Sequence, residues 1–322
     1  MGTRESIYLE KRNFEPIRGG IKDNINLCNK IVDLYENESI YSEDLIHIVS
    51  VINDVKPGAS FADNIYMGKK NLNSAHEIRD SKLYNTLVEF EVPFRVDVYG
   101  EIKSDNPHHV EITDNSYPLY NIARNFSDIE RLPPFHHLGS ENKMFDVEKK
   151  YMKSWGDFLG VPKEDCAWMI EEQSFNSNKI PSTIKGLAYK KQLKYENIDY
   201  ACLVPYKPYP SKYGIERAID TGKKYYNSVK KFDDKMNVDY GMKEVEGRIA
   251  RFKLYFKTDI IKSELYNLYD DEPIKENILI EKIHDEHNFS EDFIKNKLQD
   301  IAFSSQSSII KRGAEYKIMT DK

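Results

Sequence analysis

The chain is poor in the residues and motifs that mark several well-known classes of protein. Its three cysteines, Cys28, Cys166 and Cys202, are isolated and lack metal-ligand spacing, which indicates reduced core thiols and not a disulfide framework or a zinc site. The sequence contains no Gly-rich phosphate loop and no nucleophile elbow. No apolar run approaches the length of a membrane span, so we expect no membrane-spanning segment.

Charge of one sign is not in large excess either. The formal net charge is −6, and 31% of the residues are charged, with both signs interspersed. A general nucleic-acid binder needs a net basic face to neutralise phosphates, so this mild acidity predicts no nucleic-acid partner. The first residues lack the apolar core of a secretory signal, and we therefore expect a cytoplasmic protein.

Tyrosine is the residue type that stands out. The chain has 22 tyrosines against 15 phenylalanines. A tyrosine combines an apolar ring with a polar tip, so this excess suits a pocket that is both apolar and polar. An AT-rich genome, which raises Tyr, Lys, Asn and Ile together, would produce the same excess without any such pocket.

Hydrophobic periodicity divides the first half of the chain into helices and strands. Apolar residues recur at helical spacing in 24–35 and again in 145–159, where Gly160 follows the predicted helix. Between them, 87–102 alternates as a strand does, and 108–113 is placed to return antiparallel to it.

The second half repeats the alternation of strand pairs and helices. Strands are predicted for 184–193, 198–206 and 248–258, a helix for 290–303 and a last strand for 309–319. Hairpins between helices favour antiparallel pairing, and closing the sheet removes exposed edges. We therefore expect an α+β fold, an antiparallel β-barrel surrounded by α-helices, in a single domain over residues 1–322. The alternative is a helix-backed open antiparallel sheet.

The segment 251–255 has the most distinctive pattern. On a strand, residues two apart share a face, which would put Arg251, Lys253 and Tyr255 together and the apolar Phe252 and Leu254 opposite. Cations enclosed in a barrel would need an anion, and a diphosphate meets that need. The plain alternative is a solvated sheet face.

Several stretches then resemble one family. Arg251 to Phe256 resembles the R-x-K-x-Y strand of aromatic prenyltransferases of the dimethylallyltryptophan synthase type. Gly186 to Lys190 resembles a short strand of that family, and Ile198 to Pro205 resembles its K-x-Y-x-x-P strand. The family has an antiparallel barrel wrapped by helices, so the resemblance implies the same fold here.

The resemblance also implies a reaction and roles for named residues. An isoprenoid would pass from dimethylallyl or geranyl diphosphate to an indole or other aromatic acceptor, or to a peptide, in secondary metabolism, with Mg²⁺ possible and no cofactor required. The diphosphate would be bound by Arg95, Lys190, Arg251, Lys253 and Tyr255. The allylic cation would be shielded by Tyr189, Tyr200 and Tyr316. The acceptor would be acted on by Glu89 and Glu91.

Two other function classes stay open. His109-x-Glu111, with His284 or His287 as a third ligand, would form the triad of a non-haem iron oxygenase of the 2-oxoglutarate type, in which Arg312 would hold the co-substrate carboxylate. The third class is a non-catalytic interaction protein with a tyrosine-rich surface.

Overall fold

The computed structural model describes most of the chain, and the statements below refer to these ranges: 4–62, 78–101, 117–133, 145–171, 198–204, 206, 208–209, 211–268, 273–303 and 309–318. Contacts between Cα atoms divide the chain into unit 1, Met1–Ile180 with Tyr200–Arg248, and unit 2, Pro181–Asp199 with Ile249–Lys322. Each unit is described separately. The expectation of a single domain stays a prediction.

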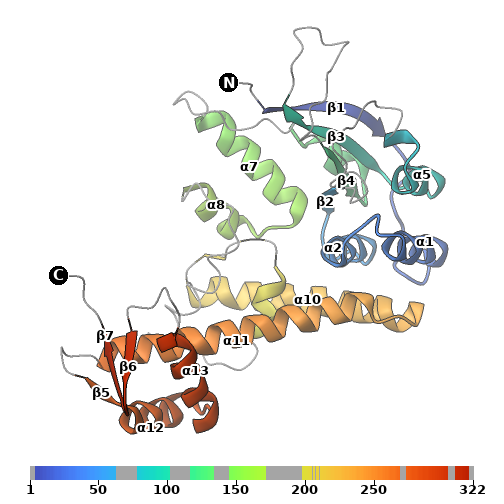
Figure 1. The fold of residues 1–322 in the computed structure, drawn as a ribbon. Coiled ribbons are helices and arrows are strands. Elements are labelled where there is room, and N and C mark those ends of the chain that lie inside the picture. Colours follow the sequence, from blue (N-terminus) through green and yellow to red (C-terminus); the bar gives the residue numbers. More distant parts are fainter. Residues whose placement is uncertain are drawn as a thin grey trace. The chain divides into compact units, whose positions relative to one another are not determined.

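Unit 1 contains an open four-stranded sheet (Figure 1). Its strands are β1 (Arg4–Arg12), β2 (Gly58–Ala62), β3 (Phe94–Glu101) and β4 (Tyr117–Ala123). They are ordered β1-β3-β4-β2, and each neighbouring pair is antiparallel. β1 and β2 are therefore edge strands, and this sheet is not closed.

The helices of unit 1 form its core with this sheet. They are α1 (Ile25–Glu36), α2 (Ser42–Ile52), α5 (Lys82–Glu89), α6 (Phe126–Glu130), α7 (Phe145–Leu159), α8 (Lys163–Glu171) and α10 (Lys212–Met236). Side chains of α1 at helical spacing, such as Leu27, Ile31 and Leu34, are buried together with Phe94 and Val96 of β3 in the main hydrophobic cluster. A short 3-10 helix, η2, covers Ile198–Leu203.

α11 (Tyr240–Leu268) is a single helix of 29 residues, and the strand predicted for 248–258 is therefore wrong. The buried side chains Phe252, Phe256 and Ile260 are spaced four apart, as on one face of a helix. Because residues an even number apart also lie on one face of a strand, the spacing of Phe252 and Phe256 fits a strand as well as a helix. Leu254 decides between them, because a strand would bury it and it is 47% exposed.

Unit 2 consists of the later part of α11 and a small C-terminal assembly. β5 (Ile274–Lys275), α12 (Glu276–His287), α13 (Glu291–Phe303), β6 (Ile309–Arg312) and β7 (Glu315–Ile318) follow in that order. The three strands pair antiparallel in the order β5-β7-β6. Apolar side chains including Leu279, Ile283, Leu298 and Tyr316 are fully buried.

The predicted barrel is contradicted by this arrangement. The described strands form two separate antiparallel sheets, one in each unit, and neither closes. The alternative expectation, a helix-backed open antiparallel sheet, describes the sheet of unit 1 but not the second sheet, which lies in unit 2. The physical cause is that much of the apolar sequence read as strand pairs lies in helices, as in α11. Within the described residues, no helix has both the length and the apolar character required to cross a membrane.

Candidate functional site

The three residues of the predicted diphosphate-binding strand lie on α11. Successive residues of a helix are about 100° apart, so Arg251 and Tyr255 share a face and Lys253 points to a different side. All three are exposed, Tyr255 by 57%. The Lys253 ammonium forms an ion pair with Asp199, 2.9 Å away. They do not form the enclosed cationic face that the strand would have given.

Arg95 is buried in β3, and its donors are used within the protein. Its guanidinium donates twice to Asp97 Oδ2, at 3.0 and 2.8 Å, and to the carbonyl oxygens of Leu132 and Pro133, at 2.7 and 3.2 Å. Asn121 donates to the same Asp97 oxygen at 2.9 Å. Burial raises the pKa of Asp97, whereas Arg95 and then Asn121 oppose that rise. This network holds the sheet together and leaves Arg95 engaged in it.

The remaining predicted residues are dispersed. Glu89 ends α5, and Glu91 follows in a left-handed backbone conformation with φ 51°; both are exposed. Tyr200 packs edge-on against Tyr226, with ring centroids 5.4 Å apart. Tyr316 lies in the core of unit 2. Lys190, Tyr189, His109 and Glu111 fall outside the described residues.

In unit 2, the junction between α12 and α13 is a tight helix-turn-helix. Asn288 has φ 53° and its backbone N–H donates to the carbonyl of His284 at 2.8 Å. The ring of His284 also bonds through Nδ1 to the Phe289 carbonyl, at 2.8 Å. Phe289 is buried, and the Ser290 hydroxyl accepts from the N–H of Phe293 at 3.4 Å. These contacts fix the direction in which α13 leaves the turn.

α13 has one buried and one outward face. Ile294, Leu298 and Ile301 are buried, at the spacing of a helical stripe. The opposite side carries Asp292, Asn296, Gln299 and Phe303, and Phe303 is 83% exposed. An outward face with two side-chain amides offers paired hydrogen-bond donors and acceptors to a ligand.

The strands β6 and β7 form a hairpin beside this motif. Arg312 pairs with Glu315 across a two-residue turn. Gly313 in this turn has φ 63°, and short hairpin turns require such a positive φ. The space around Gly313 is open. Tyr316 anchors the hairpin because its hydroxyl donates to Glu276 at 3.1 Å, and Lys311 bonds to the same oxygen at 2.7 Å. The tip therefore extends from a fixed base.

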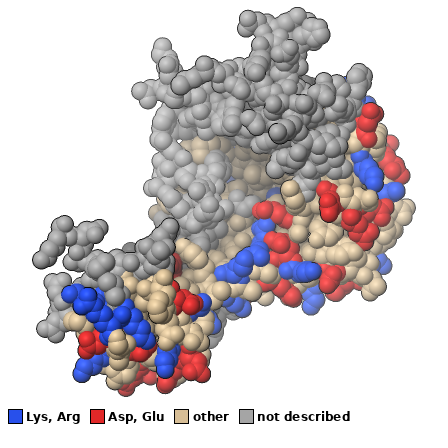
Figure 2. All heavy atoms as spheres, viewed as in Figure 1, with Lys and Arg blue, Asp and Glu red and all other residues tan. Residues whose placement is uncertain are grey.

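Exposed cations accompany these elements. Lys275, Lys295, Arg312 and Lys317 are exposed on β5, α13, β6 and β7. On the face drawn in Figure 2, Lys and Arg side chains gather near the strands of unit 2. Arg312 and Tyr316 were expected on one strand over 309–319, but they lie on the two strands of this hairpin.

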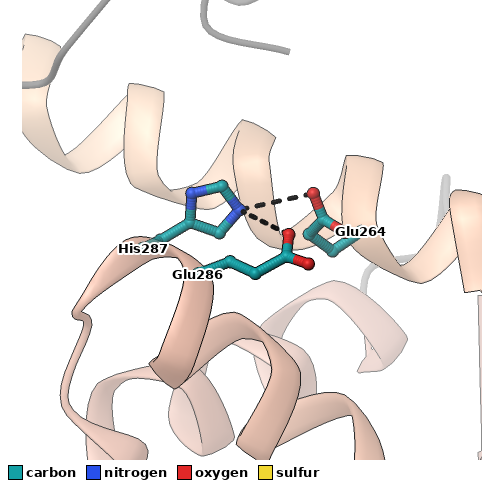
Figure 3. A group of neighbouring side chains, drawn as sticks. All are labelled: Glu264, Glu286 and His287. Atoms are coloured by element: carbon teal, nitrogen blue, oxygen red, sulfur yellow. Dashed lines mark hydrogen bonds and ion pairs between the residues drawn. The ribbon is translucent and has the colours of Figure 1, made fainter. Parts of the chain in front are cut away.

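Unit 2 also brings together one group of side chains suited to a metal ion. Glu264 of α11 and Glu286 and His287 of α12 lie side by side, with one ligand atom of each within 4.8 Å of the others (Figure 3). The oxygenase hypothesis placed His287 in a metal site with Glu111. In the structure, the carboxylates next to His287 are those of Glu264 and Glu286.

In unit 1, Lys56 is an ionisable group that burial perturbs strongly. It is 3% exposed, has no ion-pair partner among the described residues, and burial lowers its pKa to about 7. Its ammonium lies 6.0 Å from the ring centroid of Tyr225, and His47 packs edge-on against that same ring. Burial also keeps the pKa of His47 well below its usual range. An amine that is partly neutral near pH 7 can act as a base or nucleophile, but this one is enclosed.

Unit 1 has an open pocket of about 400 Å³ lined by Lys22, Lys230, Lys231, Lys235, Asp234, Ile21 and Asn227. Its lysines are exposed, so water already solvates their charge. The pocket therefore lacks the enclosed geometry that discriminates one anion from another.

Comparison with protein-family models, with curated proteins and with solved structures finds no match for this chain. Unit 2 has the connectivity of a winged helix-turn-helix. The helix α11 and the short strand β5 are followed by α12 and α13, which a tight turn joins, and then by the β6–β7 hairpin, and the sheet order is β5-β7-β6.

Proposed function

We propose that unit 2 binds double-stranded DNA, with α13 as the recognition helix and the β6–β7 hairpin as the wing. The observation that carries the proposal is the connectivity α11-β5-α12-α13-β6-β7 with its sheet order. In helix-turn-helix proteins the second helix of the motif enters the major groove and the first crosses the backbone. The tight turn at Asn288 and the outward polar face of α13 suit those two roles.

The outward face of α13 supports base recognition. The major groove is wide enough for one helix, and Asn or Gln bonds adenine through two atoms there. Asn296 and Gln299 are placed to do so, and Lys295 at the edge of the face suits a guanine. The ring of Phe303, at the end of the helix, can contact a thymine methyl group. These contacts would give the protein sequence preference.

The exposed cations support backbone contacts. Lys275, Arg312 and Lys317 are candidates for phosphate contacts around the recognition helix. Such contacts fix orientation on the duplex but do not read sequence. The expectation of no nucleic-acid partner rested on the net charge of the whole chain, which averages over unit 1, whereas binding depends on the local charge of the docking face. The proposal therefore departs from that expectation.

The test uses the full chain and a pool of random duplexes. We expect selection to enrich a short motif, and binding of that motif, followed by fluorescence anisotropy, to weaken steeply with salt. Asn296→Ala should lose about 1–3 kcal/mol of preference at one base position. Arg312→Ala should weaken all duplexes alike and reduce the salt slope by about one.

Asn85→Ala, on the exposed side of α5 in unit 1, is the matched control for the amide substitution and should bind DNA like the parent. The proposal is wrong if the chain binds no duplex at low salt. It is equally wrong if the substitutions in α13 and the wing leave binding unchanged.

The exposure of Phe303, at 83%, favours a second candidate, a protein-binding winged helix. This agrees with the expectation of a non-catalytic interaction protein. A chain that ignores duplex DNA but binds a defined protein partner through Phe303, and loses it in Phe303→Ser, would replace the first candidate with the second.

Prenyl transfer to an aromatic acceptor stays a prediction, as do its diphosphate donor, optional Mg²⁺ and the cytoplasmic location. Diphosphate binding by Arg251, Lys253 and Tyr255 required these residues to share one strand face, but they lie on a helix. Thermal stabilisation of the chain by dimethylallyl or geranyl diphosphate would restore it.

A further inference from the structure

The group Glu264, Glu286 and His287 lies where α12 ends and the turn of the helix-turn-helix begins. Glu264 comes from α11, whereas Glu286 and His287 are the last two residues before Asn288. Figure 3 shows the imidazole and both carboxylates directed toward one another. Any ligand held by all three would join α12 to α11 at the turn.

The distances in this group suit tetrahedral coordination. His287 Nε2 lies 3.3 Å from Glu264 Oε1 and 4.0 Å from Glu286 Oε2. In a tetrahedral zinc site with bonds near 2.0–2.1 Å, neighbouring ligand atoms are roughly 3.4 Å apart. All three ligand atoms lie within 4.8 Å of one another, and Glu286, which is exposed, is the side chain that would move to bring them to that spacing.

The donor types also suit a metal. Zinc binds both imidazole nitrogens and carboxylate oxygens, and a site with three protein ligands leaves the fourth position to water. The Glu264 carboxylate already bonds to the His287 ring through Oε1, at 3.3 Å. Lys282 holds the other oxygen of Glu264 at 3.4 Å, which orients the carboxylate as outer-shell partners of metal ligands do.

The site is accessible on one side. The side chain of Glu286 is 45% exposed and that of His287 is 17% exposed, whereas Glu264 is 9% exposed. An ion would meet Glu286 at the surface and bind against the buried Glu264. This gradient also leaves room for a water ligand on the solvent side.

We propose that Glu264, Glu286 and His287 bind one divalent transition-metal ion of the zinc class, which fastens the end of α12 to α11. The inference does not rest on DNA binding, because the metal contacts no residue of the outward face of α13. If unit 2 does bind DNA, the ion stabilises the turn that orients the recognition helix.

The test is a titration of the full chain, freed of metal, with Zn²⁺ by calorimetry and with Co²⁺ by visible absorption. We expect one site, and the absorption of four-coordinate Co²⁺. Glu286→Gln and His287→Gln should each abolish that site, and circular dichroism should show an intact fold. Glu281→Gln, an exposed glutamate on the same helix, is the matched control and should bind metal like the parent chain.

Two results would overturn the proposal: no Zn²⁺ binding above background, or binding that survives both Glu286→Gln and His287→Gln. The titrations contain no DNA, and duplex binding is measured separately with a chelator present. Failure of the metal site and failure of the proposed function are therefore distinguishable.

Discussion

The two units differ in where they place charge. Unit 1 encloses charged and polar groups in its interior: Arg95 with Asp97 in the sheet, and Lys56 and His47 near Tyr225. In unit 2, Glu264 is the one charged residue among the described residues that is buried, and it has His287 and Lys282 as partners. The other charges of unit 2 lie on or near the surface, beside the helix-turn-helix and its wing.

Buried and exposed charged groups have different effects on a protein. A buried charge is costly unless it is paired, so it specifies one arrangement of the core and makes substitutions there expensive. A surface charge costs little and is available for a partner. Substitution of the buried charges of unit 1 should therefore change mainly stability, and substitution of the surface charges of unit 2 should change mainly binding. The following predictions test that contrast.

Arg95→Met should have the largest effect, because it leaves Asp97 buried at 1% exposure without its cation. We expect a loss of about 3–5 kcal/mol in the free energy of unfolding, measured by urea denaturation. Replacing both residues, Arg95→Met with Asp97→Leu, should recover most of the loss. If the Arg95→Met variant were as stable as the parent, the Arg95–Asp97 pair would contribute nothing to the stability of the sheet.

Leu298→Ala should remove a fully buried side chain from the small core of unit 2. The expected cost is about 2–5 kcal/mol, confined to unit 2. Hydrogen exchange should show lost protection in α12 and α13 while amides of α1 and α2 keep theirs. Equal loss in both units would show that they unfold together, and would support the single domain predicted from the sequence.

Lys56→Met tests the buried amine, which has no ion-pair partner among the described residues, through pH. The folded pKa is lowered to about 7 from 10.5, so the unfolded chain binds more protons between those values and stability rises with pH in that window. From pH 7 to about pH 8.5, Lys56 should add about 1.5 kcal/mol to the free energy of unfolding.

The Lys56→Met variant should lack this gain. The measurement is urea denaturation of both chains at each pH, and the variant should be more stable than the parent at pH 7. Parallel pH profiles for the two chains would show that the ammonium is solvated or paired in solution.

Tyr316→Phe should have the smallest effect. It removes the hydrogen bond to Glu276, 3.1 Å long, and leaves the buried ring in place. A typical hydrogen bond contributes about 1 kcal/mol, and the melting temperature of unit 2 should fall accordingly. A loss several times larger would indicate that the hairpin depends on this hydroxyl for its position.

The sequence predicted elements best where periodicity and end signals agree. The helix expected at 145–159 is α7, and the helix expected at 290–303 is α13. The Ser290 hydroxyl accepts a hydrogen bond from the backbone N–H of Phe293 at the start of α13. Short apolar runs were ambiguous, because periodicity alone cannot distinguish a buried strand from part of a helix. The strand predicted for 198–206, for example, begins in the 3-10 helix η2.

The candidate site was missed for a related reason. Its signals were present: Asn288 and Ser290 between two helical segments, and Arg312-Gly313 before a strand. They indicate a turn and a hairpin only once α12 is recognised as a helix. The pairing of Glu264 with His287 joins residues 23 apart in sequence, and periodicity within one element cannot predict contacts between elements.

The turn at Asn288 has a consequence for evolution. His284, Asn288 and Phe289 are linked by backbone and ring bonds whose spacing depends on the number of residues between them. One inserted or deleted residue would break both bonds and rotate α13 about its axis. In relatives of this chain, substitutions should therefore accumulate on the outward face of α13, whereas the length from His284 to Phe293 should be constant.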